Sequence, residues 1–85
     1  EHIFFLFHVM MNKMRKDSMT LGERIQKYRK MKGLSQEELG KLLHISRQTI
    51  SKWESNLSSP DIQSCKAMAD IFVISLEELL DESKK

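Results

Sequence analysis

Arg47, Gln48, Ser51 and Lys52 place four hydrogen-bonding side chains close together in the middle of the chain. An arginine can donate two hydrogen bonds to O6 and N7 of guanine, and a glutamine can pair in the same two-bond way with N6 and N7 of adenine. If the segment is helical, Lys52 lies one turn and a residue beyond Arg47 and faces the same groove. Any exposed helix carries polar residues, so these four side chains alone do not indicate a binding site. The interpretation depends on the segments around them.

Two helix starts lie close together around this segment. Ser35 is a good N-cap, and Glu38 three residues later completes a capping box, while Ser46 is a second N-cap. The sequence therefore predicts one helix over 36–43, a two-residue turn, and another helix over 47–55. A short helix, a tight turn and a second helix form a helix-turn-helix, the unit that places its second helix in the major groove of DNA.

Residues 34–54 resemble the helix-turn-helix of the phage repressor and Cro family of regulators, the xenobiotic-response-element type. The resemblance extends from about 21 to 80 and does not include 1–19. It implies a compact all-α, five-helix domain that binds double-stranded DNA by sequence and regulates transcription, most simply as a repressor. The residues that carry it are Gln36, Leu39, Gly40, Ile45, Ser46, Ile50, Trp53 and Glu54.

The resemblance also assigns roles to individual residues. The family contacts bases from the positions of Arg47, Gln48 and Lys52, and Ser51 is a further candidate. Gln36 begins its helix, where unpaired N–H groups and the helix dipole attract a phosphate. The matching glutamine of the family clamps the DNA backbone.

Two further phosphate contacts and one ion pair are expected. Thr49 and Asn56 are the candidate phosphate contacts, the latter through its main chain. Arg29 and Glu54 match a family pair that ties the first helix to the end of the recognition helix. Phosphate contacts fix the position of the protein on DNA, whereas base contacts carry the sequence information.

The charge distribution suits a polyanionic partner. Residues 1–52 hold eleven Lys or Arg against five acids, a balance of +6, whereas residues 53–85 hold three against seven, a balance of −4. A basic front and an acidic back are typical of a protein with one face on nucleic acid. Two unlike solvated faces are the alternative interpretation.

The length and composition limit the remaining possibilities. A chain of 85 residues makes one small domain with a marginal core, so we expect a homodimer. A two-fold dimer places two recognition helices about 34 Å apart, which requires a near-palindromic operator. The single cysteine, Cys65, excludes an internal disulfide and favours the cytoplasm. We expect no membrane partner, no cofactor and no metal site.

Catalysis is not expected, because the sequence shows no paired carboxylates, no Ser-His-Asp set and no phosphate-binding loop. The alternative to a DNA-binding regulator is an antitoxin-like or adaptor module. Such a module would bind a protein partner through the N-terminal segment or through exposed leucines of the last helix.

Residues 1–19 are interpreted as an N-terminal extension, 20–82 as the DNA-binding domain and 83–85 as a tail. The extension is apolar, but it is too short for a membrane span and lacks the basic start of a signal peptide. It can be a short strand that pairs with its copy in a dimer, or an anchor to a membrane or another protein. Alternatively it precedes the native start, at Met10, Met11, Met14 or Met19.

Similar signals place the other helices. Thr20 with Glu23 forms a capping box at the start of a helix that Gly33 ends, because a left-handed position favours glycine. A fourth helix is expected to begin at 59–61, with serine as its cap and proline at its first position. The last helix is expected over 76–82, after a capping box formed by Ser75 and Glu78.

Helical spacing predicts the buried and exposed faces. The buried stripes are expected to comprise Leu39, Leu42 and Leu43 in the second helix, and Ile62, Cys65, Ala69 and Phe72 in the fourth. The basic outer surface of the first helix is expected to comprise Arg24, Lys27, Arg29, Lys30 and Lys32.

Two turns lack a glycine at the position where a left-handed backbone conformation favours one. The family usually has glycine at the position of His44, but histidine tolerates this conformation, so the fold is expected to hold with some strain. Val73 is a poor left-handed residue, which predicts that its turn is built differently.

Overall fold

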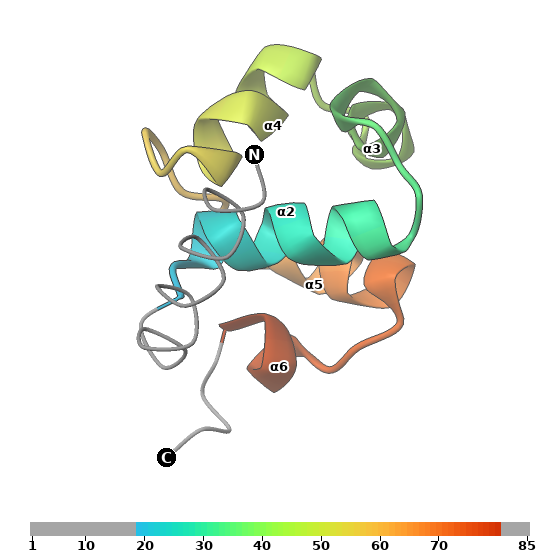
Figure 1. Ribbon diagram of the computed structural model, residues 1–85, viewed down its shortest axis with the longest axis vertical. Helices are drawn as coiled ribbons and strands as arrows, with labels where there is room; N and C mark the ends of the chain where they lie inside the picture. Colours follow the sequence, from blue (N-terminus) through green and yellow to red (C-terminus); the bar gives the residue numbers. More distant parts are fainter. Residues whose placement is uncertain (1–18, 81–85) are drawn as a thin grey trace, which may run out of the picture.

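The computed structural model describes residues 19–80, and this part of the chain is all α-helical. Helices α3 and α4 lie on one side of α2 and α6 lies on the other, with α5 behind α2 (Figure 1). The predicted all-α, five-helix fold is confirmed for these residues, whereas the N-terminal extension and its possible strand lie outside them. The helices are α2 (Leu21–Met31), α3 (Gln36–Leu43), α4 (Arg47–Glu54), α5 (Ile62–Phe72) and α6 (Leu76–Leu80).

Three helices begin with the capping box that the sequence predicts. In each, the hydroxyl of the cap accepts from the N–H three residues later, and the glutamate there accepts from the N–H of the cap, at 2.8–3.1 Å. These bonds satisfy N–H groups that have no acceptor within the helix, so the start is encoded locally. The pairs are Thr20 with Glu23, Ser35 with Glu38, and Ser75 with Glu78.

Helix α5 begins later than predicted. Ser59 is not its cap and Pro60 is not its first residue; Asp61 is the N-cap. The Asp61 carboxylate accepts from the main-chain N–H of Ser64 at 3.0 Å. Hydrogen bonds from the side chain and main chain of Ser64 hold the pKa of Asp61 below its ordinary value. A carboxylate at the positive end of a helix is a stronger hydrogen-bond acceptor than a serine hydroxyl. This explains why α5 begins after Asp61 and not after Ser59.

The turns after α3 and α5 have the same backbone conformation. His44 has φ 61° and ψ 43°, as the sequence predicts, and Val73 has φ 60° and ψ 49°. The prediction that the Val73 turn would be built differently is therefore wrong. In both turns the N–H of the next residue donates back to the helix. The N–H of Ile45 donates to the Gly40 carbonyl oxygen at 2.8 Å, and the N–H of Ile74 donates to the Ala69 carbonyl oxygen at 3.0 Å. These bonds and the packing of the following isoleucine against the core offset the unfavourable left-handed valine.

Two residues predicted for the core are exposed. Leu42 is 54% exposed, because the short helix α3 buries a narrow face against α4 and α5. Ile62 is 52% exposed, because it is the first residue of α5. Met68, fully buried, was not predicted. The buried core comprises Ile25, Leu39, Ile50, Trp53, Cys65, Met68, Phe72 and Leu79.

Cys65 is a core residue, as predicted, and is 3% exposed. Burial and, secondly, the charge of Asp61 raise the pKa of its thiol. The thiol is therefore protonated at neutral pH and has low reactivity.

Two arginines predicted on the outer surface of α2 are buried. Arg24 is 9% exposed and Arg29 is 7% exposed. The Arg24 Nε donates to the carbonyl oxygen of Leu79 at 2.6 Å, and its guanidinium also bonds the carbonyl oxygen of Met19. Arg24 therefore holds α6 against α2. The three lysines of the prediction are exposed.

Helix α6 does not present the exposed leucines that were expected to contact a partner. Leu79 is fully buried, and Leu76 and Leu80 are half-buried against the core. The helix begins as predicted, but residues 81 and 82 lie outside the described part.

The start of α2 lies directly against the end of α4. A Cβ at Gly22 would overlap the Trp53 carbonyl oxygen and lie 2.7 Å from that of Glu54. The Asn56 side chain joins the same contact, since its Oδ1 accepts from the Gly22 N–H at 3.2 Å and its Nδ2 donates to Thr20 Oγ1 at 3.0 Å. This contact fixes the end of α4.

We expect Gly22→Ala to lower the free energy of unfolding by about 2 kcal/mol, because the new methyl group meets backbone atoms that cannot rotate away. Urea unfolding monitored by Trp53 fluorescence measures this change. Gly33→Ala is the comparison, since Gly33 has φ 71° and open space around it. Gly33→Ala should lower the free energy of unfolding by only about 1 kcal/mol, because alanine is disfavoured in a left-handed backbone conformation. Equal stability of Gly22→Ala and the wild type would contradict this account of the contact.

Val73→Gly should raise the free energy of unfolding by roughly 0.5–1 kcal/mol. Glycine removes the left-handed penalty of about 1–2 kcal/mol but gains freedom in the unfolded chain. The valine side chain is 75% exposed, so little buried area is lost. Thermal unfolding measures the change, and His44→Gly should gain less because histidine tolerates the conformation better. A destabilised Val73→Gly protein would refute the expectation.

Candidate nucleic-acid interface

Helices α3 and α4 meet in a tight turn. His44 ends α3, and Ser46 caps α4 by accepting from the Thr49 N–H at 3.2 Å. Gly40 allows the close approach, because a Cβ there would lie 2.5 Å from the Ile45 carbonyl oxygen. The turn therefore sets α4 at a fixed angle to α3 (Figure 1).

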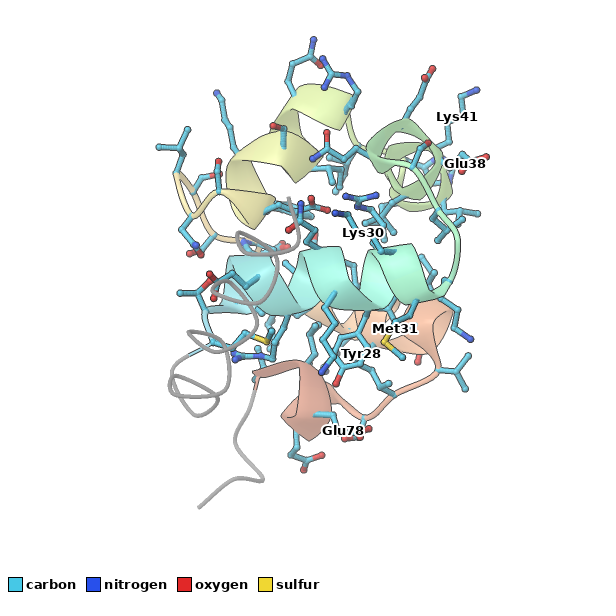
Figure 2. All side chains as sticks on the ribbon, in the orientation of Figure 1. Tyr28, Lys30, Met31, Glu38, Lys41 and Glu78 are labelled. Carbon is cyan, nitrogen blue, oxygen red and sulfur yellow. The ribbon has the colours of Figure 1, made fainter. Side chains whose placement is uncertain are left out.

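Helix α4 has one buried face and one polar face. It begins at the predicted residue and ends at Glu54, one residue before the predicted end. Ile50 and Trp53 are buried, at 0% and 6% exposed. Side chains of α4 extend outward on the side away from α2 (Figure 2). Of the predicted base contacts, the exposed ones are Arg47, Gln48 and Lys52, and Ser51 is half-buried.

The predicted phosphate contacts lie at three different places. Gln36 is half-buried at the first position of α3. Thr49 is half-buried in the first turn of α4, with its Oγ1 3.0 Å from Ser46 Oγ. Asn56 is exposed beyond the end of α4, at φ 65°. Its N–H donates to the Trp53 carbonyl oxygen at 3.1 Å, so part of its bonding capacity is used within the protein.

The carboxylate of Glu54 joins α2, α3 and α4. Arg29 donates to it twice, from Nε to Oε2 at 2.6 Å and from Nη2 to Oε1 at 3.0 Å. The two side chains are 8% and 4% exposed. Gln36 Nε2 donates to the same Oε1 at 3.0 Å. The predicted ion pair thus lies buried, and a predicted phosphate contact is bonded to it.

Arg29 also holds the segment that leads into α3. Its Nη1 donates to the carbonyl oxygen of Leu34 at 2.7 Å. One guanidinium therefore binds both the end of α4 and the residue before the cap of α3. Removing one partner of a buried pair leaves an uncompensated charge and destabilises a protein by about 3–5 kcal/mol.

Sequence reasoning missed two of these contacts. Asn56 was identified only as a candidate phosphate contact, and its side-chain partners Thr20 and Gly22 are far away in the chain. The bond from Gln36 to Glu54 joins residues that were assigned separate roles. Both contacts join residues that are far apart in the chain, so neither produces a spacing pattern that could be read from the sequence.

Within residues 19–80, no group of three potential ligands could hold a metal ion. None of the helices described there has the length and apolar character needed to cross a membrane.

The chain is similar to known helix-turn-helix proteins. Over 62 residues it is 40% identical to the HTH-type transcriptional activator BcrR of Enterococcus faecalis, covering 73% of this chain and 30% of that protein. Over 63 residues it is 36% identical to the HTH-type transcriptional regulator SinR of Bacillus subtilis, covering 73% of this chain and 57% of that protein. The chain thus spans about a third to somewhat over half of these two relatives.

Solved structures show the same fold. SinR in complex with DNA is 35% identical, with a TM-score of 0.68, over 73% of this chain and all of that chain. The P22 c2 repressor in complex with a synthetic operator is 33% identical, with a TM-score of 0.67, over 72% of this chain and 92% of that chain.

Residues 25–79 match the model of the helix-turn-helix family HTH_3. This match covers the caps of α3, α4, α5 and α6, the turn between α3 and α4, and the Arg29–Glu54 pair, and it begins after the cap of α2. The relatives include a phage repressor. The resemblance predicted from residues 34–54 is confirmed: the chain belongs to the helix-turn-helix family of transcriptional regulators of the phage repressor and Cro type.

Proposed function

We propose that this chain is a sequence-specific, double-stranded DNA-binding transcriptional regulator that inserts α4 into the major groove. The observation that carries the proposal is the exposed polar edge of α4, at Arg47, Gln48 and Lys52, opposite a buried face that is anchored to α2. Similarity to SinR and to the P22 c2 repressor, both solved in complex with DNA, supports it.

Base recognition follows from the chemistry of that edge. Arg47 and Gln48 begin α4, where side chains of a recognition helix contact base edges. We assign Arg47 to guanine O6 and N7 and Gln48 to adenine N6 and N7. Lys52 lies on the same polar side, and Ser51 is a further base contact.

Positioning on the DNA backbone is assigned to residues around this edge. Gln36 lies at the start of α3, where N–H groups and the helix dipole favour a phosphate. Thr49 and Asn56 contact further phosphates. Such contacts set the register of α4 without adding sequence information.

The assembly and biological setting complete the proposal. A homodimer on a near-palindromic operator lets two copies of residues 20–82 contact half-sites one helical turn apart. The protein acts in the cytoplasm, by binding and without catalysis. Repression by blocking polymerase is the simplest mode, although the relatives include both an activator and a repressor.

Selection of bound duplexes from a random pool should enrich an inverted repeat. The variant with Arg47→Ala and Gln48→Ala should lose this enrichment, because each lost two-bond contact removes about 1–3 kcal/mol of base discrimination. The matched control carries Gln63→Ala and Lys66→Ala, on exposed positions of α5, and should recover the wild-type repeat. Recovery of the same sequences by the α4 variant would contradict the proposal. No enrichment by any protein would favour the protein-partner alternative.

Gln36→Ala should weaken binding of every duplex by a similar factor, about tenfold, because a bond to a charged phosphate is lost. The preferred bases should not change, and neither should the salt dependence, since glutamine carries no charge. Fluorescence anisotropy with the enriched duplex and single-base variants of it measures both quantities. A change in the preferred base at one position would assign Gln36 to a base instead.

A further inference from the structure

We propose that Glu54 is a positioning residue that directs the amide of Gln36 at one DNA phosphate. The inference rests on the proposed function, and it gives a DNA-binding role to a side chain that is itself buried. Glu54 ends α4, whereas Gln36 begins α3, so this carboxylate links the helix that contacts bases to a helix that contacts the backbone.

The bond between the two residues fixes which way the amide points. Gln36 Nε2 lies 3.0 Å from Glu54 Oε1 and donates one of its two hydrogens there. The flipped amide would place its oxygen against the carboxylate, bringing two acceptors together. The nitrogen therefore stays toward Glu54, and its second hydrogen is available to an acceptor outside the protein.

The start of α3 supplies further donors beside this amide. The capping box uses the N–H of Glu38, bonded to Ser35 Oγ at 3.0 Å. Within the described residues, this leaves the main-chain N–H groups of Gln36 and Glu37 without an acceptor in α3. A phosphate oxygen that accepts from the Gln36 amide can accept from these N–H groups as well.

The carboxylate cannot turn away from Gln36. Two hydrogen bonds from Arg29 hold both of its oxygens, and the Glu54 side chain is 4% exposed. Arg29 also bonds the carbonyl oxygen before the cap of α3. The amide is thus ordered before DNA arrives, so less side-chain entropy is lost on binding than for a free glutamine.

Arg29 has a second role in this arrangement. A carboxylate beside a phosphate would repel it, and the paired guanidinium cancels that charge. Loss of Arg29 alone would therefore leave an uncompensated negative charge near the DNA backbone. The pair must be removed as a unit to test positioning without changing the net charge.

The test uses the duplex enriched by selection, with each phosphate replaced in turn by a neutral methylphosphonate. Gln36→Ala identifies the phosphate that Gln36 contacts, as the position where replacement lowers the affinity of the variant clearly less than that of the wild type, since the main-chain N–H groups at the start of α3 remain. The positioning variant combines Arg29→Met with Glu54→Met, which leaves no lone buried charge and keeps the packing apolar. Thermal unfolding fixes a temperature at which every protein is folded. Lys66→Gln with Asp70→Asn is the matched control, because it also removes one positive and one negative charge, at exposed positions of α5.

Wild-type protein and the α5 control should lose about tenfold affinity on replacement of the Gln36 phosphate. The double variant should lose no more affinity there than Gln36→Ala does, while its response to the other phosphates and its base preference stay unchanged. A full tenfold loss in the double variant, or an equal reduction at every phosphate, would overturn the inference. Equal sensitivity of Gln36→Ala and the wild type at every phosphate would overturn it too. Failure of the wild type to enrich any duplex would instead refute the proposed function.

Discussion

The buried carboxylate of Glu54 constrains how α4 packs against α2 and α3. It accepts two hydrogen bonds from Arg29 on α2 and one from Gln36 on α3, so three helices meet at one charged group. A charge that is almost fully enclosed is tolerated only with such partners, because desolvation without them is expensive. With the charge present, another angle of α4 would leave the carboxylate without these partners, so the pair disfavours misplaced arrangements of the helices. That preference gives a small domain a defined binding edge.

Close backbone contacts complete the constraint. Gly22 brings the start of α2 against the end of α4, and Gly40 brings α3 against the turn. Neither position has room for a Cβ, so the helix spacing is set by main-chain atoms that cannot change rotamer. The apolar core beneath α4 supplies stability. The close contacts at Gly22 and Gly40 set the angle of α4 to α2 and α3, and the ion pair disfavours other angles. The polar edge at the start of α4 is thereby held rigid before any partner binds, which favours specificity over adaptability.

The parts of this structure that were predictable from sequence are local. Capping boxes and left-handed positions depend on residues a few places apart, so the starts of α2, α3 and α6 and the His44 turn were predicted. The cap of α5 was misplaced because two capping residues compete there, and the stronger acceptor, Asp61, prevails. Contacts between distant segments, such as Asn56 with Gly22, leave no periodic signal. The exposure of Arg47, Gln48 and Lys52 was predictable, because the exposed face of a helix follows from its buried face. The bases that they would contact cannot be predicted from this pattern.

If α4 contacts base edges in the major groove, changes to single atoms of the bases should weaken binding. We would replace single guanines of the enriched duplex with 7-deazaguanine, which removes the N7 acceptor, and separately with inosine, which removes only a minor-groove amino group. One 7-deaza replacement per half-site should weaken wild-type binding and have no further effect on Arg47→Ala protein. Inosine should be neutral at that position. Sensitivity to inosine alone, or a 7-deaza effect that persists in Arg47→Ala, would contradict the assignment of α4 and Arg47.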